Sequence, residues 1–229
     1  MNTPKERPIL VSGRLIRPIL TGHKTQTRRL INPKIAEYFG EGAAVAMTDG
    51  HTGPGWYMWS GEYPDEGSSF LRCPFGVPGD RLWVRETWRP VDWNGDGSRV
   101  VVAYDATNGS EQICAAPSGF DFKAWAEREQ RRIDNAPMAC APERPSIHMP
   151  RWASRISLEV VDVRVQRVQE ISEEDARAEG APAIPRLDGS DPRYYRQSFA
   201  ALWDSLAPAG QEWADNPWVW AVTFKRVTP

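Results

Sequence analysis

The sequence predicts one small domain of the α+β class: a mixed β-barrel with flanking helices and two long insertions. Short stretches of alternating apolar and polar residues, typical of strands, occur along the whole chain of 229 residues. A longer stretch, 155–168, changes the side on which its apolar residues fall, as a strand bent around a small barrel does. Few segments have helical spacing, which argues against a doubly wound parallel sheet.

Local signals predict the elements in the first third of the chain. The apolar residues 8–11 predict a strand, and the helical spacing over 15–20 predicts a helix. A second strand is expected over 25–31. Residues 34–78 are rich in glycine, proline and aromatic residues without a sustained period. They predict a loop-like segment that contains the first insertion, at about 34–72.

The middle of the chain predicts a strand, a hairpin and a surface helix. Residues 81–88 alternate strictly, and their alternation places Glu86 on the apolar face. The sequence "NGDG", 94–97, is a strong hairpin signal inside the second insertion, 89–143. Residues 120–133 have the spacing of an amphipathic helix.

The C-terminal third predicts two strands and two helices. A bulge or sharp bend near Val160 and Val161 would keep both halves of the long strand facing one core. A helix is expected over 172–180, with a serine cap at its start and a glycine at its end. A second helix is expected from Asp191 and Pro192, as N-cap and first helical residue, and 218–224 alternate as a final strand.

Composition narrows the functional class. The 28 lysines and arginines balance 30 aspartates and glutamates, so the chain lacks the global positive charge of a protein that coats duplex DNA. No stretch approaches the roughly 18 apolar residues of a membrane span. Cys73, Cys114 and Cys140 contain no C-x-x-C pair, so no disulfide framework or zinc knuckle is indicated. We expect a cytoplasmic protein whose 11 tryptophans serve either the core or a base-stacking surface.

The segment "TGHKTQTRRL", 21–30, concentrates donor and charge chemistry. In a turn, Lys24 and Thr27 can come within hydrogen-bond reach, and a desolvated lysine that loses its proton can activate a hydroxyl or a water. Arg28 and Arg29 can hold phosphate or carboxylate. The alternative interpretation is an exposed, solvated turn.

Two glutamates depart from local rules. Glu179 lies at the carbonyl end of its predicted helix, where the helix dipole disfavours a carboxylate by up to about 1 kcal/mol. Such a departure is typical of a functional site, and a solvated glutamate at a frayed helix end is the alternative. Glu86, between Val84 and Trp88, must be paired or protonated if buried, which a structural ion pair with an arginine also satisfies.

The segment "RPSIHMPRWASR", 144–155, mixes basic and aromatic residues. His148, Arg151, Trp152 and Arg155 can clamp a base and its phosphate, while a lone histidine is often structural. The sequence contains no H-x-x-x-H pair, no His/Cys cluster of metal spacing and no P-loop. A site without a metal or other cofactor is therefore expected.

Three motifs, "GHKTQTRR", "GDRLWVRETW" and "ISEEDARAEG", resemble the ASCH family of the PUA-like superfamily. The chain is most similar to larger phage- and prophage-encoded members of this family, which share the type of segment at 144–155. The resemblance covers about 8–31, 75–88, 144–180 and 199–226. It implies a small PUA-like barrel with flanking helices and a cleft for RNA or a nucleotide-like ligand.

Some small bacterial ASCH proteins are amidohydrolases that deacetylate N4-acetylcytidine with a lysine, a threonine and a glutamate. The resemblance implies these roles for Lys24 as base and oxyanion partner, Thr27 as nucleophile or water-positioning hydroxyl, and Glu179 as proton shuttle. We therefore predict a metal-independent hydrolase acting on a modified nucleoside, nucleotide or RNA base.

Two alternatives remain open: a non-catalytic module that binds RNA or single-stranded nucleic acid, and an RNA-cleaving protein. A binding module would use the surfaces around Trp83, Arg85 and Trp152. The expected nucleotide- or nucleic-acid-binding residues are Arg28, Arg29, Trp83, Arg85, Glu86, His148, Arg151, Trp152 and Arg155.

Overall fold

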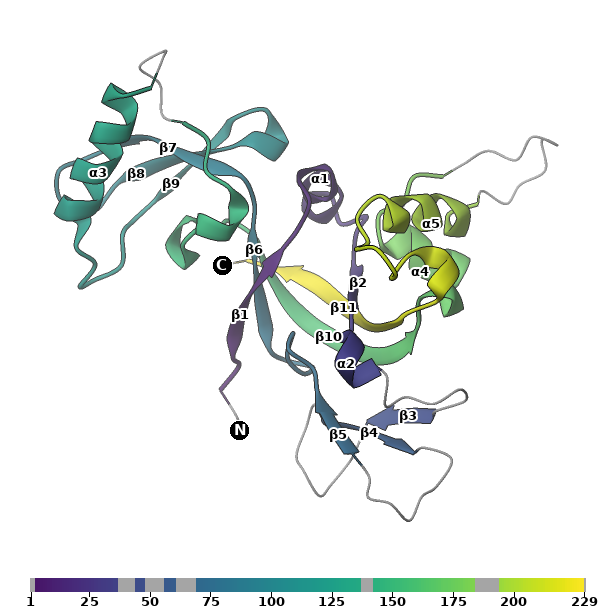
Figure 1. Cartoon of the computed structure of the whole chain (residues 1–229). Coiled ribbons are helices and arrows are strands. Elements are labelled where there is room, and N and C mark those ends of the chain that lie inside the picture. Colours follow the sequence, from purple (N-terminus) through teal and green to yellow (C-terminus); the bar gives the residue numbers. More distant parts are fainter. Residues whose placement is uncertain are drawn as a thin grey trace. The chain divides into compact units, whose positions relative to one another are not determined.

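The computed structural model describes residues 3–36, 44–47, 56–60, 69–136, 142–183 and 194–228. These residues form β-sheets and helices of the α+β class, as expected (Figure 1). The chain divides into two compact units that interleave along the sequence. The first unit is Met1–Lys5, Thr21–Arg81 and Glu159–Arg226; the second is Glu6–Leu20, Leu82–Leu158 and Val227–Pro229.

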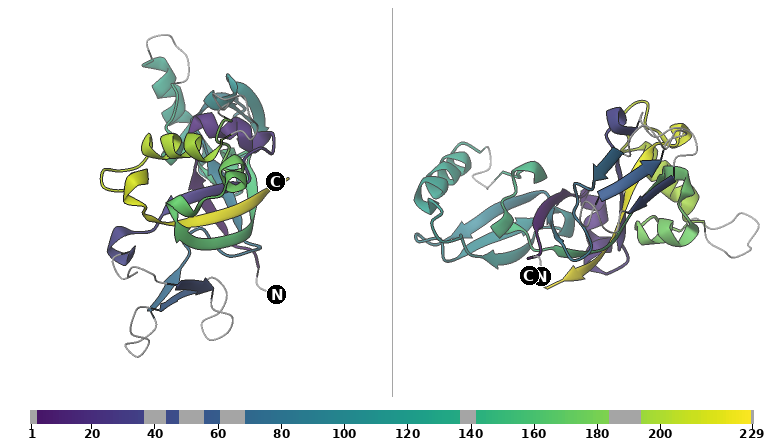
Figure 2. Two further views of the ribbon diagram at one scale, coloured as in Figure 1. Left: turned by 90° about the vertical axis from the view of Figure 1, so that its right-hand side faces the viewer. Right: turned by 90° about the horizontal axis from the view of Figure 1, so that it is seen from below.

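The longest series of paired strands has five members. Their order is β1 (Glu6–Leu10), β6 (Arg81–Arg85), β10 (Ser157–Arg167), β11 (Trp218–Val227) and β2 (Gln26–Leu30). In the first unit β2 runs beside β11 (Figures 1 and 2). The two strands are antiparallel, and Thr27 lies opposite Val222. The order of the described strands is that of an open sheet, so the PUA-like barrel stays a prediction.

The first unit packs two of its helices over a hydrophobic cluster. Helix α4 (Glu173–Ala178) contacts α5 (Arg196–Asp204), and α2 (Pro33–Ala36) follows β2. The buried residues of this cluster are Val168, Ile171, Ala176, Ala181, Phe199, Trp203 and Val219. The ends of α4 are as predicted, because Ser172 Oγ accepts the N–H of Asp175 at 3.0 Å and Gly180 has a φ of +81°.

A three-stranded antiparallel sheet occupies part of the first insertion. It consists of β3 (Ala44–Met47), β4 (Trp56–Ser60) and β5 (Ser69–Arg72). The prediction of a loop-like segment was therefore wrong for these three stretches. Strands of four or five residues are too short to show a period, and pairing with neighbouring strands outweighs weak local preference.

The second unit contains the predicted hairpin and surface helix. Strands β7 (Trp88–Trp93), β8 (Val100–Tyr104) and β9 (Ser110–Cys114) form an antiparallel sheet, with "NGDG" between the first two. Helices α1 (Gly13–Leu20) and α3 (Phe122–Asp134) complete the unit, and five short 3₁₀ turns occur in the described parts of the chain. These turns are η1 (Asp105–Thr107), η2 (Ser146–His148), η3 (Arg151–Ala153), η4 (Val168–Glu170) and η5 (Trp213–Asp215).

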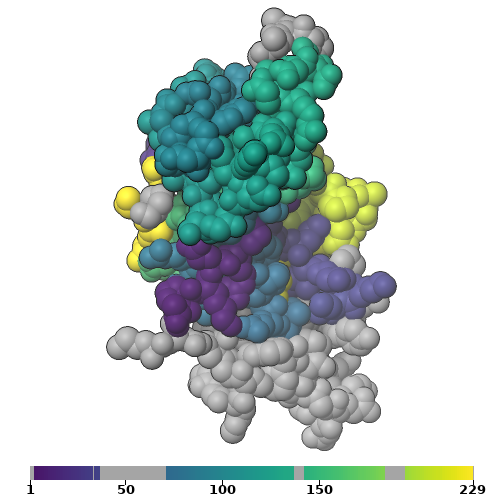
Figure 3. All heavy atoms as spheres, turned by 90° about the vertical axis from the view of Figure 1, so that its left-hand side faces the viewer, coloured from purple at the N-terminus to yellow at the C-terminus, as the bar shows by residue number. Residues whose placement is uncertain are grey.

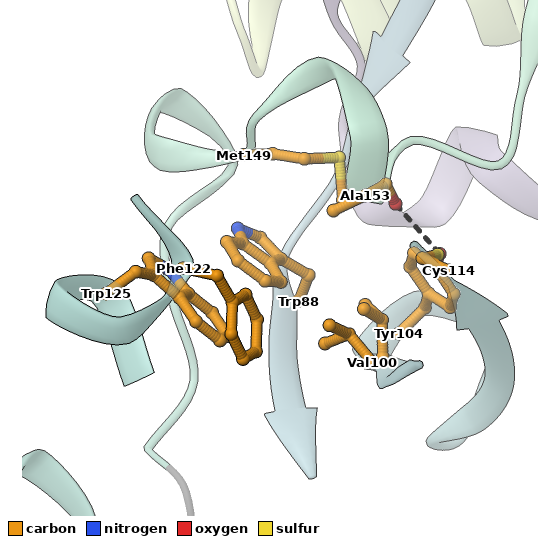
Figure 4. Close-up of a cluster of buried hydrophobic side chains, with 9 residues drawn as sticks. Trp88, Val100, Tyr104, Cys114, Phe122, Trp125, Met149 and Ala153 are labelled. Carbon is orange, nitrogen blue, oxygen red and sulfur yellow. Dashed lines mark hydrogen bonds between the residues drawn. The ribbon is translucent and has the colours of Figure 1, made fainter. Parts of the chain in front are cut away.

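Trp88 lies at the centre of the second unit's hydrophobic cluster (Figure 4). Its fully buried ring is surrounded by side chains from β8, α3 and the segment before β10. The buried members are Trp88, Val100, Val102, Tyr104, Cys114, Phe122, Trp125, Met149 and Ala153. Tyr104 Oη donates a hydrogen bond of 2.8 Å to Ala153 O, which ties β8 to η3.

Two boundaries differ in detail from the prediction. In β10 the buried side switches after Val160, since Val163 is buried whereas Val161 is 46% exposed. Helix α5 begins at Arg196 with Tyr195 as its N-cap residue. The predicted cap at Asp191 and Pro192 lies outside the described residues. Within the described part of the chain, no helix has both the length and the apolar composition of a membrane span.

Candidate functional site

Lys24 is the centre of a buried hydrogen-bond network in the first unit. The residue precedes β2, and only 2% of it is exposed. Its Nζ donates to Gln26 O at 2.8 Å, to Glu179 O at 2.8 Å and to Glu179 Oε2 at 2.7 Å. The three hydrogens of the ammonium therefore each have an acceptor, and the segment is not a solvated turn.

Glu179 is the C-cap residue of α4 and is 4% exposed. Its position at the carbonyl end of a helix is unfavourable for a carboxylate by itself. The Lys24 ammonium resolves the conflict, because it pairs with the carboxylate and also satisfies the main-chain carbonyl of the same residue. Glu179 therefore lies in an ordered buried pair and not at a frayed, solvated end.

Arg28 extends this network along β2. Strand alternation places Gln26 and Arg28 on one side of β2. Arg28 Nη1 donates to Gln26 Oε1 at 2.5 Å and to Glu179 Oε1 at 3.3 Å, and its Nη2 donates to Asp175 Oδ2 at 2.8 Å. The Arg28 side chain has no exposed surface, so the structure uses it inside the network and not for a phosphate.

Asp175 holds the two β2 side chains from α4. Its Oδ1 accepts from Gln26 Nε2 at 3.1 Å, and its Oδ2 accepts from Arg28 and, at 3.1 Å, from Arg164 Nη2. Burial by itself raises the pKa of Asp175, but the Arg28 hydrogen bond and the neighbouring arginine charges leave this pKa below its usual value.

Burial also shifts the basic groups of the network. Desolvation lowers the pKa of Lys24, and the Glu179 carboxylate opposes part of this effect. Desolvation likewise lowers the pKa of Arg29, again against the attraction of Glu179. The network therefore contains a lysine whose loss of a proton is made easier by its surroundings.

The Lys24–Glu179 pair differs in chemistry from the other buried ion pairs of the described residues. Glu86 pairs with Arg155 and Glu129 pairs with Arg144. An arginine does not give up its proton in a protein, whereas a lysine does when its pKa is lowered. Of these pairs, Lys24 and Glu179 are therefore the ones that can exchange a proton between their side chains.

Thr27 is buried but is not joined to Lys24. It is 5% exposed, and its main chain pairs with Val222. Among the described residues its Oγ1 makes no hydrogen bond, and the hydrogens of Lys24 Nζ are used elsewhere. The structure thus brings Lys24 and Glu179 together, and the predicted contact between Lys24 and Thr27 is not formed.

Glu86 and Arg155 form a structural ion pair in the second unit. Arg155 Nε and Nη2 donate to the two carboxylate oxygens of Glu86 at 2.9 and 2.8 Å. The same guanidinium also donates to Thr107 Oγ1 and Ser110 Oγ, each at 2.9 Å. It lies 3.9 Å from the centre of the Tyr104 ring. This is the structural alternative that the sequence left open for Glu86.

The two tryptophans expected to stack on bases are used inside the second unit. Trp152 packs edge-on against Trp88 and Trp125, with ring centres 6.0 and 5.7 Å apart. Trp83 is 8% exposed, and the guanidinium of Arg85 lies 4.9 Å from its ring centre. Neither ring is an open stacking platform in this arrangement.

The remaining candidates in the second unit lie near its surface. His148 is exposed at the end of η2. Arg151 donates to Glu6 at 2.8 and 3.2 Å and to Ser157 Oγ at 3.2 Å. The described residues contain no group of three or more His, Cys, Asp or Glu side chains arranged to hold a metal ion.

Gln26 and Asp175 belong to the network, but sequence reasoning did not include them in the site. The signals were present in the spacing. Gln26 lies midway between Lys24 and Arg28 in a stretch of period two, and Asp175 precedes Glu179 by one helical turn. Gln26 therefore lies on the same side of its strand as Arg28, and Asp175 lies on the same face of its helix as Glu179.

Comparison with known proteins adds no assignment. No protein-family model matches the chain, and no curated protein or solved structure has significant similarity to it.

Proposed function

We propose that this chain is a metal-independent hydrolase that removes an acyl group from a modified nucleobase, with N4-acetylcytidine as the representative substrate. The proposed fold is an ASCH-type, PUA-like barrel that carries the two insertions. The observation that supports the proposal best is the buried Lys24–Glu179 pair, with 2.7 Å between Nζ and Oε2. It combines a lysine of lowered pKa with a carboxylate that can receive and return its proton.

The proposed reaction is hydrolysis of an amide. Neutral Lys24 takes a proton from water, and the oxygen of this water forms the new bond at the acyl carbon. If the Thr27 hydroxyl attacks instead, the amine leaves first and a water that Lys24 deprotonates then cleaves the acyl-threonine ester. The resulting ammonium stabilises the oxyanion, and Glu179 carries a proton to the departing exocyclic nitrogen. The products are a carboxylic acid and the unmodified amino base, so atoms and protons balance.

The hydrogen bonds of Lys24 restrict how a substrate can be bound. Three acceptors already surround Nζ, two of them main-chain carbonyls and one a carboxylate oxygen. An oxyanion can therefore contact Nζ only by replacing one of them. We expect Glu179 Oε2 to be the one replaced, because a side chain can rotate away while the carbonyls are held by β2 and by the end of α4.

The direct test is turnover of N4-acetylcytidine and related acylated nucleosides in the presence of EDTA. Wild-type protein is compared with Glu179→Gln and with Glu129→Gln, which makes the same chemical change in a buried ion pair of the second unit. Glu179→Gln is expected to lower turnover by roughly 10²-fold or more, the usual scale of general acid–base catalysis. Glu129→Gln is expected to retain wild-type turnover per folded molecule.

Three results would count against this function: absence of turnover on every acylated base, loss of turnover with EDTA, or equal losses in the two variants. Labelled RNA incubated with the protein and separated on a gel would reveal the RNA-cleaving alternative. Binding of strands without any turnover would favour the non-catalytic module.

A further inference from the structure

Helix α3 in the second unit carries its charges on separate flanks. At about 100° per residue, Arg128, Arg131, Arg132 and Asn135 fall within one arc of about 100°. Lys123, Glu127 and Asp134 fall within a second arc of about 40°, which adjoins the arginine arc on the exposed side of the helix. The buried face lies between the outer edges of the two arcs. Glu127 and Arg131 place opposite charges at i and i+4, but Arg128 and Arg132 place like charges at the same spacing, which is unfavourable for the isolated helix.

The three arginines of this flank are exposed and have no partner within the described residues. No hydrogen bond or ion pair there engages the guanidinium of Arg128, Arg131 or Arg132. Glu129 does not offset their charge, because it is buried and already paired with Arg144. The charge of Arg128 also acts on Arg144, whose pKa is lowered first by burial and then by this neighbour. The flank is therefore a local positive surface on a chain of net charge −2.

The same flank ends in a hollow. Arg131, Arg132 and Asn135 line it together with Ala136 and Pro142, and its volume is about 440 Å³. Asn135 is held in place by a hydrogen bond of 2.6 Å from its Nδ2 to Arg131 O. α3 lies at the surface of the molecule in the space-filling view (Figure 3). The hollow is wide open to solvent, so it suits contact with the outside of a phosphate–sugar chain and not the enclosure of a small ligand.

We propose that this arginine surface, Arg128, Arg131 and Arg132 with Asn135, binds the phosphodiester backbone of a single-stranded nucleic acid. Guanidinium groups donate to phosphate oxygens in a bidentate geometry, and the Asn135 amide offers a neutral donor beside them. None of the described residues that line the hollow is aromatic, so contacts to phosphate and sugar are expected without base recognition. The surface lies inside the second insertion and shares no residue with the Lys24 network.

The test is a fluorescence-anisotropy titration of an unmodified labelled strand of about 20 nucleotides, as RNA and as DNA, across a range of salt concentrations. For the wild type, the logarithm of the association constant is expected to fall linearly with the logarithm of the salt concentration. Arg131→Gln/Arg132→Gln is expected to reduce the magnitude of this slope by about 1.4, at about 0.7 per phosphate contact on a single strand. Lys123→Gln removes a charge from the other flank of α3 and is the matched control, expected to keep the wild-type slope.

Absence of salt-dependent binding by the wild type would overturn the proposal, as would an unchanged slope in the arginine variant or an equal loss in Lys123→Gln. Tighter binding of RNA than DNA would assign the surface to RNA, and equal binding would assign it to the backbone common to both. The proposal does not rest on the hydrolase function, since the arginine surface shares no residue with the Lys24 network and strand binding is measured without turnover.

Discussion

Lys24 shows how one buried residue can combine a structural and a chemical role. Its ammonium closes the C-terminal end of α4 by donating to Glu179 O, while its contact with Oε2 forms the pair proposed to move protons. Burial weakens its hold on a proton, and the carboxylate strengthens it. The charge of Glu179 therefore keeps the pKa of Lys24 higher than burial alone would leave it.

The pH dependence of turnover tests this control. If neutral Lys24 is the base, turnover rises with pH as Lys24 loses its proton. Glu179→Gln removes the charge that raises the pKa of Lys24, so the pKa falls further and the rise moves to lower pH in the residual activity of this variant. The measurement is kcat/KM against pH for both proteins. A rise that stays at the same pH would show that another group titrates.

Asp175 is expected to position Arg28 and Gln26 for this pair. Asp175→Asn removes the charge that holds Arg28, so we expect turnover to fall by about 10-fold while the helix still forms, because Ser172 caps the Asp175 main chain. The control is Glu174→Gln. Glu174 is exposed in the same first turn of α4, so this change alters only the favourable interaction of a carboxylate with the helix dipole.

The stability of Asp175→Asn is expected to depend on pH in a defined direction. The pKa of Asp175 is lower in the folded protein than its usual value of 3.8, so the folded state binds fewer protons than the unfolded state as pH falls. The stabilisation that the charged Asp175 side chain gives to the folded state is present above about pH 4 and is lost as the pH falls through the lowered pKa. The free energies of unfolding of wild type and Asp175→Asn, measured with urea, should therefore differ at neutral pH and become equal in acid. A constant difference at all pH values would contradict the charge-based role.

At the scale of elements, α4 is short but, with its C-cap, supplies the carboxylates that hold Lys24 and the β2 side chains Gln26 and Arg28. Its six residues and C-cap present Asp175 and Glu179 one turn apart, and Ala178 O accepts the N–H of Thr25 at 2.8 Å. Three acidic residues in its first turn and glycine at its left-handed end stabilise a helix that would be marginal in isolation. Its position therefore decides whether the network forms.

The N-cap of α4 should accordingly affect both stability and activity. Ser172→Ala removes the side-chain acceptor for Asp175 N and is expected to cost about 1 kcal/mol of unfolding free energy. It should also lower turnover per folded molecule. Asp121→Ala removes the equivalent acceptor for Ala124 N in α3 and should cost a similar amount of stability without changing turnover. Thermal unfolding measures the loss of stability, and the nucleoside assay measures turnover. Equal turnover in the two variants would show that the N-cap of α4 does not support the Lys24 site.

At the scale of the whole molecule, each compact unit has its own hydrophobic cluster and its own proposed site. The Lys24 network is built entirely from the first unit, and the arginine surface of α3 entirely from the second. This division predicts that local damage in the second unit lowers stability more than it lowers hydrolysis.

Gly97 gives a sharp form of this prediction. Its φ is +74°, and a Cβ atom there would lie 2.5 Å from the Phe122 ring. Gly97→Ala is therefore expected to destabilise the protein by roughly 1–3 kcal/mol, whereas Gly95→Ala in the same turn meets no atom within 4 Å. Turnover per folded molecule should match wild type in both. Loss of turnover in Gly97→Ala alone, measured on fully folded protein, would mean that the second unit supports the hydrolytic site.

The sequence by itself determined the elements whose signals are local. Alternation identified the strand over 218–224 and the strand that begins at Arg81, although β6 ends at Arg85 and Trp88 already belongs to β7. Cap residues identified both ends of α4. These predictions succeeded because backbone geometry imposes a period of two on strands and 3.6 on helices, and because caps act within one turn. The same reasoning marked Glu179, since a carboxylate at a helix C-terminus breaks a local rule.

Only the tertiary structure decided which marked residues meet. Lys24 and Glu179 are 155 positions apart, and Glu86 and Arg155 are 69 apart, so no local period relates either pair. The two pairs had similar signals in the sequence, yet one joins a lysine and the other an arginine to its carboxylate. Short strands such as β3–β5 were missed for a related reason, because their pairing depends on distant chain. Long-range packing brings together groups that the sequence shows separately, and the chemistry of a buried pair depends on which partner is placed there.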